Sequence, residues 1–186
     1  MPAAPYLSLV KPWHVGPSTE IARNRIFALN ERRNTSPAGK TGTFVYLDSA
    51  DWCNVIALTP SRQVVMIEQF RHGIEQVTLE VPGGIIDEGE APAAACAREL
   101  AEETGYTGEP CRIIGTVSAN PAIQNNRVHT GLVTSATLSG KTSPDEHEDI
   151  GVRLVDLAEV PSLIRQGIIH HSYVVAAFQH LHVTGL

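Results

Sequence analysis

The sequence predicts an α/β fold, an α/β/α sandwich built on a mixed sheet and preceded by a small N-terminal β extension. Two observations predict it. Apolar segments of strand length recur along the chain, as at 64–71 and 129–133. One glutamate-rich helix is expected between such segments and a second, apolar helix near the C-terminus, at 172–183. Two helices with strands between them are most simply accommodated on opposite faces of a sheet.

The first part of the chain is expected to form the β extension. We assign residues 1–50 to this N-terminal module and residues 51–186 to the main domain. Residues 13–15 and 24–29 alternate enough to predict short strands, separated by a Gly-Pro-Ser turn at 16–18. A turn at 36–40 and a further strand at 43–47 complete the module.

The main domain begins with an apolar segment at 51–58 and a strong strand at 64–71. A return strand at 75–81 carries Glu80 directly ahead of Pro82-Gly83-Gly84. After the glutamate-rich helix, strands are predicted at 111–117, 129–133 and 150–155. A helix over 156–167, capped by Asp156 and with Pro161 in its first turns, precedes the terminal helix.

The two ends of the glutamate-rich helix are predicted from a proline and a glycine. Pro92 suits a first-turn position and Gly105 a left-handed stop. The helical period places Glu99 and Glu103 one turn apart with Glu102 beside them. It places Ala93, Ala97, Leu100 and Thr104 on the side that faces a core.

The clustered glutamates need a partner of opposite charge. Like charges on one helix face cost about 0.2–0.5 kcal/mol per pair. A hard divalent cation such as Mg²⁺ would offset that repulsion, because it prefers oxygen ligands and also binds phosphates. A solvated acidic surface is the alternative interpretation.

Composition narrows the range of functions. A net charge of −6 argues against a nucleic-acid-binding surface, which would be basic. The three cysteines, Cys53, Cys96 and Cys111, form no C-x-x-C pair, and there is no long apolar run or signal peptide. We therefore expect a cytoplasmic protein that binds neither membrane nor nucleic acid, with Cys96 as a small buried residue.

One window carries a family signature. The pattern G-x5-E-x7-R-E-U-x-E-E-x-G-U, where U is bulky and apolar, is matched by Gly84, Glu90, Arg98, Glu99, Glu102, Glu103 and Gly105. Leu100 fills the first apolar position, and Tyr106 fills the second, where an aliphatic residue is usual. This window resembles the signature of the Nudix hydrolases, which cleave a nucleoside diphosphate linked to another group.

The resemblance implies a metal site and its supporting residues. Glu99, Glu102 and Glu103, with the carbonyl of Gly83, would bind Mg²⁺, with Mn²⁺ as an alternative ion. Arg98 would support the glutamates, which agrees with its interpretation as a salt-bridge partner of Glu102. Glu90 would either bind metal indirectly or cap the helix start, where negative charge is favoured.

Substrate-binding residues follow from a second resemblance. The segment EQFRHG at 68–73 is similar to the Gln-aromatic-Arg segment of ADP-ribose and nucleotide-sugar diphosphatases, as is the position of Pro121. Arg71 would bind a diphosphate, or else be a surface arginine at a strand end. Glu80 would lie near substrate and metal, or else end its strand in solvent. Trp52 and Arg127 complete the predicted substrate-binding set.

The polar loop at 142–148 is expected to carry the general base. Glu146 is the first choice and Glu148 the second, and together with Glu102 and Arg98 they form the predicted catalytic set. His147 is a further base by its intrinsic pKa, without support from the resemblance.

These residues predict a Mg²⁺-dependent hydrolase of a nucleoside diphosphate sugar. ADP-ribose, cleaved to AMP and ribose 5-phosphate, is the preferred substrate. A nucleoside triphosphate or dinucleoside polyphosphate hydrolase and a non-catalytic nucleotide sensor are the alternatives. By resemblance, the N-terminal module would form a homodimer and contribute to the substrate pocket; the alternative is an extension at the edge of the fold with no such role.

Overall fold

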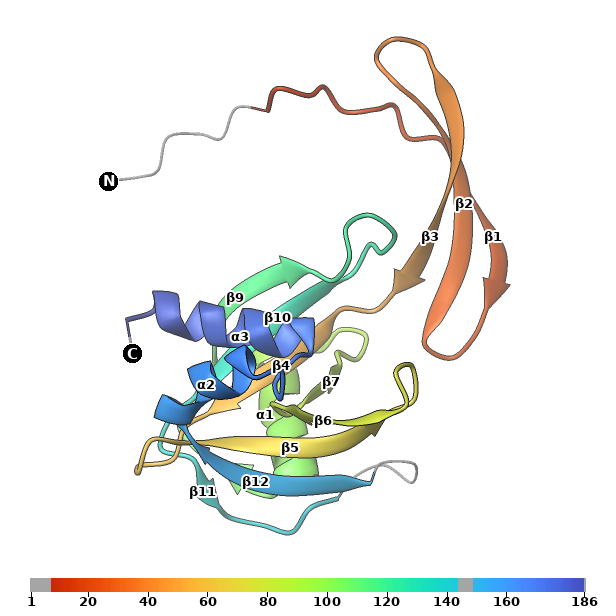
Figure 1. Ribbon diagram of the computed structural model, residues 1–186. Helices are drawn as coiled ribbons and strands as arrows, with labels where there is room; N and C mark the ends of the chain where they lie inside the picture. Colours follow the sequence, from red (N-terminus) through yellow and green to blue (C-terminus); the bar gives the residue numbers. More distant parts are fainter. Residues whose placement is uncertain (1–7, 144–148, 186) are drawn as a thin grey trace. The chain divides into compact units, whose positions relative to one another are not determined.

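The computed structural model describes residues 8–143 and 149–185 (Figure 1). The chain divides into two compact units. The N-terminal unit comprises Met1–Ser49 and Asn120–Asn125, and the main unit comprises Ala50–Ala119 and Asn126–Leu186. Among the helices of the described residues, none has both the length and the apolar content needed to cross a membrane.

The N-terminal unit is built on a three-stranded antiparallel sheet. Its strands are β1 (Ser18–Arg23), β2 (Phe27–Thr35) and β3 (Thr41–Ser49), with β2 in the centre. The strand expected at 13–15 is reduced to an isolated bridge between His14 and Thr35. The first strand instead begins at Ser18, inside the predicted turn, because residues 18–23 pair with β2.

A segment distant in sequence completes the N-terminal unit. Leu47 N donates a 2.7 Å hydrogen bond to the carbonyl of Ile123. Asn125 Nδ2 donates to Asp48 Oδ1 over 2.6 Å, and Ser49 N donates to Asn125 Oδ1 over 3.2 Å. Residues 120–125 therefore belong to this unit, whereas the sequence analysis assigned them to the main domain.

The main unit contains two larger sheets and a short ribbon. The mixed sheet has the order β7-β4-β10-β9 (Gly83–Ile85, Trp52–Ala57, Arg127–Val133, Arg112–Ser118), in which β4 and β10 run parallel. The antiparallel sheet has the order β12-β5-β6 (Ile150–Asp156, Gln63–Arg71, Gln76–Glu80). The ribbon pairs β8 (Tyr106–Thr107) with β11 (Thr137–Leu138).

The helices begin and end at the expected signals, with one exception. Helix α1 spans Pro92–Thr104, and Gly105 follows it with φ 72°. Helix α3 spans Ser172–Val183. The single helix predicted at 156–167 is a 3₁₀ turn, η1 (Leu157–Glu159), followed by α2 (Val160–Arg165).

The interruption at the start of α2 has a local cause. Asp156 caps η1 rather than a long helix, because its Oδ1 accepts a 2.8 Å hydrogen bond from Ala158 N. Pro161 occupies the first turn of α2, where a missing N–H is tolerated.

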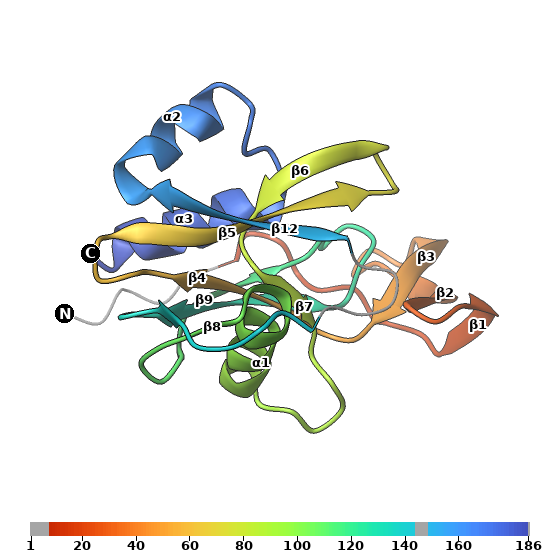
Figure 2. The same ribbon diagram turned by 90° about the horizontal axis from the view of Figure 1, so that it is seen from below.

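Alternating side chains of β4 separate two apolar cores. Cys53 and Val55 pack with residues of α1 such as Leu100, whereas Ile56 packs with residues of α3 such as Phe178. Helices α1 and α3 therefore cover opposite faces of the mixed sheet (Figure 2), which confirms the predicted α/β/α sandwich.

The buried face of α1 differs in part from the prediction. Ala95, Cys96, Leu100 and Thr104 are buried, whereas Ala93 is half-buried and Ala97 is exposed. The helix is rotated so that Glu103 is buried as well. That rotation brings a carboxylate, and not only alanines, against the sheet.

Candidate active site

The first two residues of β7 lie very close to β4 and to the Glu99 side chain of α1. A Cβ on Gly84 would lie 2.4 Å from Glu99 Oε1, and one on Gly83 would lie 2.3 Å from the Cys53 carbonyl oxygen. Glycine is therefore required at position 83, where the neighbour is backbone, whereas a side chain at position 84 would displace the Glu99 carboxylate. The result is a stretch of backbone held directly beside the carboxylates of the helix.

Two glutamates of α1 lie against Gly83 and Gly84 of β7. Glu103 is 2% exposed, and its Oε2 accepts a 2.8 Å hydrogen bond from Gly83 N. Glu99 lies over Gly84 with its side chain 13% exposed. Buried carboxylates are costly unless they are hydrogen-bonded or bind a cation. Because they lie one helical turn apart, Glu99 and Glu103 place two carboxylates on one side of the Gly83–Gly84 backbone.

Arg98 neutralises much of the acidic cluster. Its Nε and Nη2 donate to the two oxygens of Glu90, each over 3.0 Å, and Nη1 donates to Glu99 over 2.8 Å and to Glu102 over 3.0 Å. Nη2 also donates to the carbonyl of Ile85 over 3.2 Å. The hydrogen bond to Glu90, followed by those to Glu99 and Glu102, raises the pKa of Arg98 despite its partial burial.

The structure tests one of the two expectations for Glu90, namely that it caps the start of the helix. Ala91 is the N-cap of α1, and no side chain caps it by a hydrogen bond in the described part of the chain. Glu90 instead pairs with Arg98, which lowers the pKa of Glu90. Its helix-capping role is therefore not observed.

The donor set suits a hard cation bound with few protein ligands. Within residues 8–143 and 149–185, no three His, Cys, Asp or Glu side chains are gathered closely enough to hold a metal by themselves. Mg²⁺ does not need such a cage, because it usually keeps several waters and binds one or two carboxylates plus substrate phosphates. That description fits the carboxylates of Glu99 and Glu103 together with the backbone of Gly83, because all three offer oxygen ligands close together.

A second ion pair lies at the ends of β5 and β6. Arg71 Nε and Nη2 donate to the two oxygens of Glu80, each over 2.8 Å, and Thr78 Oγ1 donates to Glu80 Oε1 over 2.5 Å. Glu80 is 2% exposed, which excludes the strand end in solvent. Burial raises the pKa of Glu80, but the hydrogen bonds from Arg71 and Thr78 outweigh it, so the pKa lies below its ordinary value.

Aromatic side chains from β4 and α3 form a neighbouring group that the sequence interpretation missed in part. Trp52 contacts Tyr173 with ring centroids 5.6 Å apart, and Tyr173 contacts His171 at 5.0 Å. Asn54 Nδ2 donates a 3.0 Å hydrogen bond to the Tyr173 carbonyl. Burial lowers the pKa of His171, with Glu80 as an opposing charge. Only the order of β4 and α3 in space, not the sequence, joins these residues.

Of the remaining predicted residues, Arg127 lies beside Asp51, and the others lie outside the described residues. Arg127 begins β10 as an exposed residue, and its backbone N–H donates to Asp51 Oδ1 over 2.7 Å. Glu146 and Glu148, predicted as general base, lie outside the described residues, as does His147. Their assignment stays a prediction.

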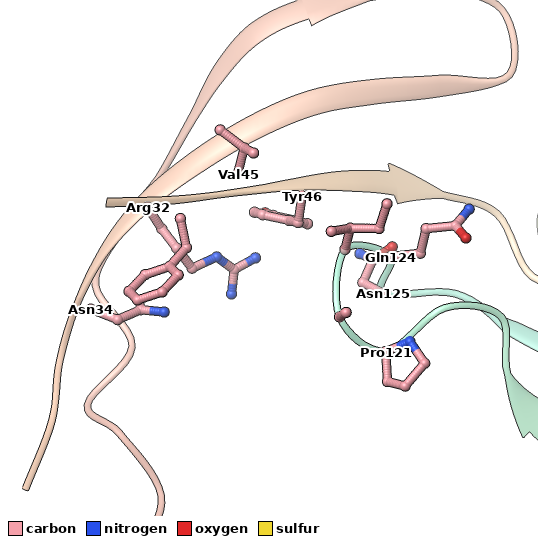
Figure 3. A pocket seen from close by; sticks show the side chains of 10 residues that line it. Arg32, Asn34, Val45, Tyr46, Pro121, Gln124 and Asn125 are labelled. Carbon is pink, nitrogen blue, oxygen red and sulfur yellow. The ribbon is translucent and has the colours of Figure 1, made fainter. Parts of the chain in front are cut away.

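The N-terminal unit carries a cavity of its own, of about 290 Å³ (Figure 3). The Arg32 guanidinium carbon lies 3.8 Å from the Tyr46 ring centroid, a cation–π arrangement. Arg32 Nε is buried without a hydrogen-bond partner among the described residues. Asn34 and Asn125 add amide groups to the lining.

Comparison with known proteins identifies the family of the chain. The NUDIX domain model matches residues 52–178. ADP-ribose pyrophosphatase of Bacillus subtilis is 31% identical over 128 residues, covering 68% of this chain and 69% of that protein. Methanol dehydrogenase activator of Bacillus methanolicus is 30% identical over 165 residues, covering 87% and 88%. Mouse ADP-sugar pyrophosphatase is 33% identical over 159 residues, covering 79% and 71%.

A solved structure supports the fold independently. The crystal structure of an ADP compounds hydrolase superposes with a TM-score of 0.81 at 17% identity, covering 95% of both chains. The chain belongs to the Nudix family. It is a Nudix hydrolase, with the signature helix observed as α1.

Proposed function

We propose that this Nudix hydrolase cleaves the diphosphate linkage of a nucleoside diphosphate sugar, with ADP-ribose converted to AMP and ribose 5-phosphate. The observation that carries the proposal is that Glu99 and Glu103 both lie against Gly83 and Gly84 of β7. The substrate class is supported by relatives named ADP-ribose pyrophosphatase and ADP-sugar pyrophosphatase.

The acidic side of the site would bind divalent metal. Glu99, Glu102, Glu103 and the Gly83 carbonyl are the proposed ligands of Mg²⁺, for which Mn²⁺ would substitute. When bound, the metal supplies Lewis acidity and neutralises the charge of the diphosphate. Arg98 holds Glu99 and Glu102 by hydrogen bonds, which restricts the positions of both carboxylates.

The basic and aromatic side would bind the substrate. Glu80 holds the Arg71 guanidinium by two parallel hydrogen bonds, so Arg71 is oriented before a diphosphate arrives. Arg71 remains 39% exposed in its side chain and can reach a ligand in solvent. Trp52 would line the site next to Tyr173, and Arg127 would contact sugar or phosphate.

A carboxylate of the 142–148 loop would accept a proton from the attacking water. Glu146 is the proposed base, with Glu148 as the second choice. The water would attack one phosphorus of the diphosphate, and the second phosphate would leave with its sugar or nucleoside.

The N-terminal unit would contribute to substrate binding in a homodimer of a cytoplasmic enzyme. Its cavity supports a ligand role, because Arg32 stacks on Tyr46 and keeps a buried donor without a described partner. A planar group with hydrogen-bond acceptors fits such a lining.

A product assay with purified full-length protein tests this proposal. ADP-ribose, GDP-mannose, ATP and a dinucleoside polyphosphate are each incubated with and without Mg²⁺, and products are separated by chromatography. We expect the fastest Mg²⁺-dependent turnover with ADP-ribose, yielding AMP and ribose 5-phosphate. Faster turnover of ATP or the dinucleoside polyphosphate would contradict the substrate class, and ADP-ribose binding without any product would indicate a sensor.

A further inference from the structure

Three cysteines that are distant in sequence come together in the apolar core between α1 and the mixed sheet. Cys53 lies on β4, Cys96 on α1, and Cys111 directly ahead of β9. All three are free thiols. Cys53 and Cys96 are 3% and 0% exposed, whereas Cys111 is partly exposed at the edge of the same apolar core. The hydrolytic site described above uses none of them.

Cys96 and Cys111 face one another across Gly131. A Cβ on Gly131 would lie 2.7 Å from Cys96 Sγ and 2.6 Å from Cys111 Sγ, so both sulfurs border the same point. Any side chain at this position of β10 would collide with both. Because a disulfide brings two sulfurs to about 2.05 Å, the pair needs to close only the space above this glycine.

The two thiols differ in access and in acidity. Cys111 is the member of the pair that reaches solvent. A hydrogen bond with Cys96 and another from the Leu132 backbone lower the pKa of Cys111, although burial raises it. Hydrogen bonding with Cys111 and Cys53, together with burial, raises the pKa of Cys96. Since the thiolate is the nucleophile, Cys111 reacts first with an oxidant from solvent.

We propose that Cys111 and Cys96 form a peroxide-sensitive pair that closes as a disulfide and displaces the helix carrying the catalytic glutamates. The effect on hydrolysis rests on the proposed function, whereas formation of the disulfide does not. The oxidant is hydrogen peroxide or another small hydroperoxide.

The chemistry balances in two steps. The Cys111 thiolate attacks one oxygen of hydrogen peroxide, the O–O bond breaks, and hydroxide leaves and takes up the proton that Cys111 had lost. Cys111 is thereby oxidised to a sulfenic acid. Cys96 sulfur then attacks Cys111 sulfur, the S–O bond breaks, and the proton of Cys96 leaves with the hydroxide as water. Two thiols and one peroxide give one disulfide and two waters.

The disulfide would act through the position of α1. Cys96 lies one helical turn before Glu99, whose carboxylate is in tight contact with Gly84. Closing the sulfur pair pulls this part of the helix toward the start of β9. A displacement of about 1 Å at a catalytic group costs on the order of a hundredfold in rate.

Peptide mapping tests the disulfide without any substrate. The full chain is treated with hydrogen peroxide, unfolded, alkylated without reductant and digested, and the masses of the peptides are measured. We expect a Cys96–Cys111 linked peptide with the loss of two hydrogens. Cys53→Ala should retain it, and Cys111→Ser should lose it. An alkylated Cys96 after peroxide treatment, or a link from Cys96 to Cys53, would overturn the proposal.

Turnover gives the second measurement. We expect oxidation to lower hydrolysis by roughly a hundredfold, with recovery after dithiothreitol, and Cys111→Ser to resist peroxide. Unchanged turnover of the fully linked protein would refute the displacement of α1. If the link forms but the reduced protein hydrolyses no nucleotide sugar, the proposed substrate is wrong and the thiol pair stands.

Discussion

Two arginines of the main unit bind carboxylates in contrasting ways. Arg98 divides its donors among Glu90, Glu99 and Glu102, whose side chains are 13–45% exposed. Arg71 gives two parallel hydrogen bonds to Glu80, whose side chain is 3% exposed. Both are arginine–glutamate interactions with distances close to 3 Å, yet the first is a partly solvated network and the second is centred on a buried carboxylate.

The difference indicates separate roles. A carboxylate that shares an arginine with others and reaches solvent can exchange that contact for a cation. A buried carboxylate matched by one arginine is expensive to separate, because removing either partner leaves an uncompensated buried charge. We therefore expect the Arg98 network to determine metal-dependent rate and the Arg71 pair to determine both stability and the orientation of a substrate-binding guanidinium.

The largest expected effect is on turnover when Glu103, a proposed metal ligand outside the Arg98 network, is changed. Glu103→Gln preserves an oxygen acceptor for Gly83 N but removes the charge. We expect Mg²⁺-dependent turnover to fall by about 10³-fold, because a bound metal contributes several kcal/mol to the transition state. Steady-state kinetics measures it, and Glu109→Gln, on an exposed turn, is the matched control. Parental turnover in Glu103→Gln would remove Glu103 from the metal ligands.

The next effect is on stability. Arg71→Met leaves Glu80 buried without its guanidinium, and we expect the free energy of unfolding to fall by about 2 kcal/mol at pH 7, given that Arg71 is partly exposed. Chemical denaturation measures this change. The control is Arg153→Met, which breaks an exposed pair with Glu68 on the same sheet and should cost less than about 1 kcal/mol. Equal losses in the two variants would contradict the contrast drawn above.

The pH dependence of that loss follows from Glu80. In the parent, the pKa of Glu80 is below its ordinary value, so its contribution is present above the unfolded pKa of about 4.3 and is lost as the pH falls through the folded value. In Arg71→Met, burial without the arginine raises the pKa of Glu80, and protonation then favours folding. The gap between parent and variant should therefore shrink as the pH falls toward about 4. A gap that is constant with pH would mean that Glu80 is not its cause.

The smallest effect on stability is expected in the Arg98 network. Arg98→Met should lower the free energy of unfolding by about 1 kcal/mol or less, since each of its pairs is partly solvated. Turnover should fall about 10–100-fold, as when residues that orient metal ligands are lost. Thermal unfolding and kinetics measured on the same preparation test both parts. Arg153→Met, which breaks an exposed pair outside the network, is the control.

Much of the fold was readable from local signals. Pro92 and Gly105 delimit α1 because a first-turn proline and a left-handed glycine act within one turn of the helix end. The terminal helix was predicted at 172–183, where α3 lies. Residues 18–23 were assigned partly to a turn, since all six are exposed and form a strand only by pairing with β2.

The pairings among the predicted site residues could not be predicted from the sequence. Glu80 and Arg71 were both candidates for substrate contacts, yet their mutual ion pair depends on the register of β5 with β6, in which Ile67 is opposite Glu80. The thiol group likewise depends on Gly131 of β10 passing beside α1. Such contacts follow from strand order, which the spacing of residues along the chain does not encode.

The segment 120–125 has a consequence for dissecting the protein. The chain passes between the two compact units after Ser49, after Ala119 and after Asn125. Deleting the first 49 residues would consequently strip Ile123 and Asn125 of the backbone partners that Leu47 and Ser49 supply. The truncated protein would retain residues 120–125 without these partners, so residues 1–49 cannot be removed as an independent unit.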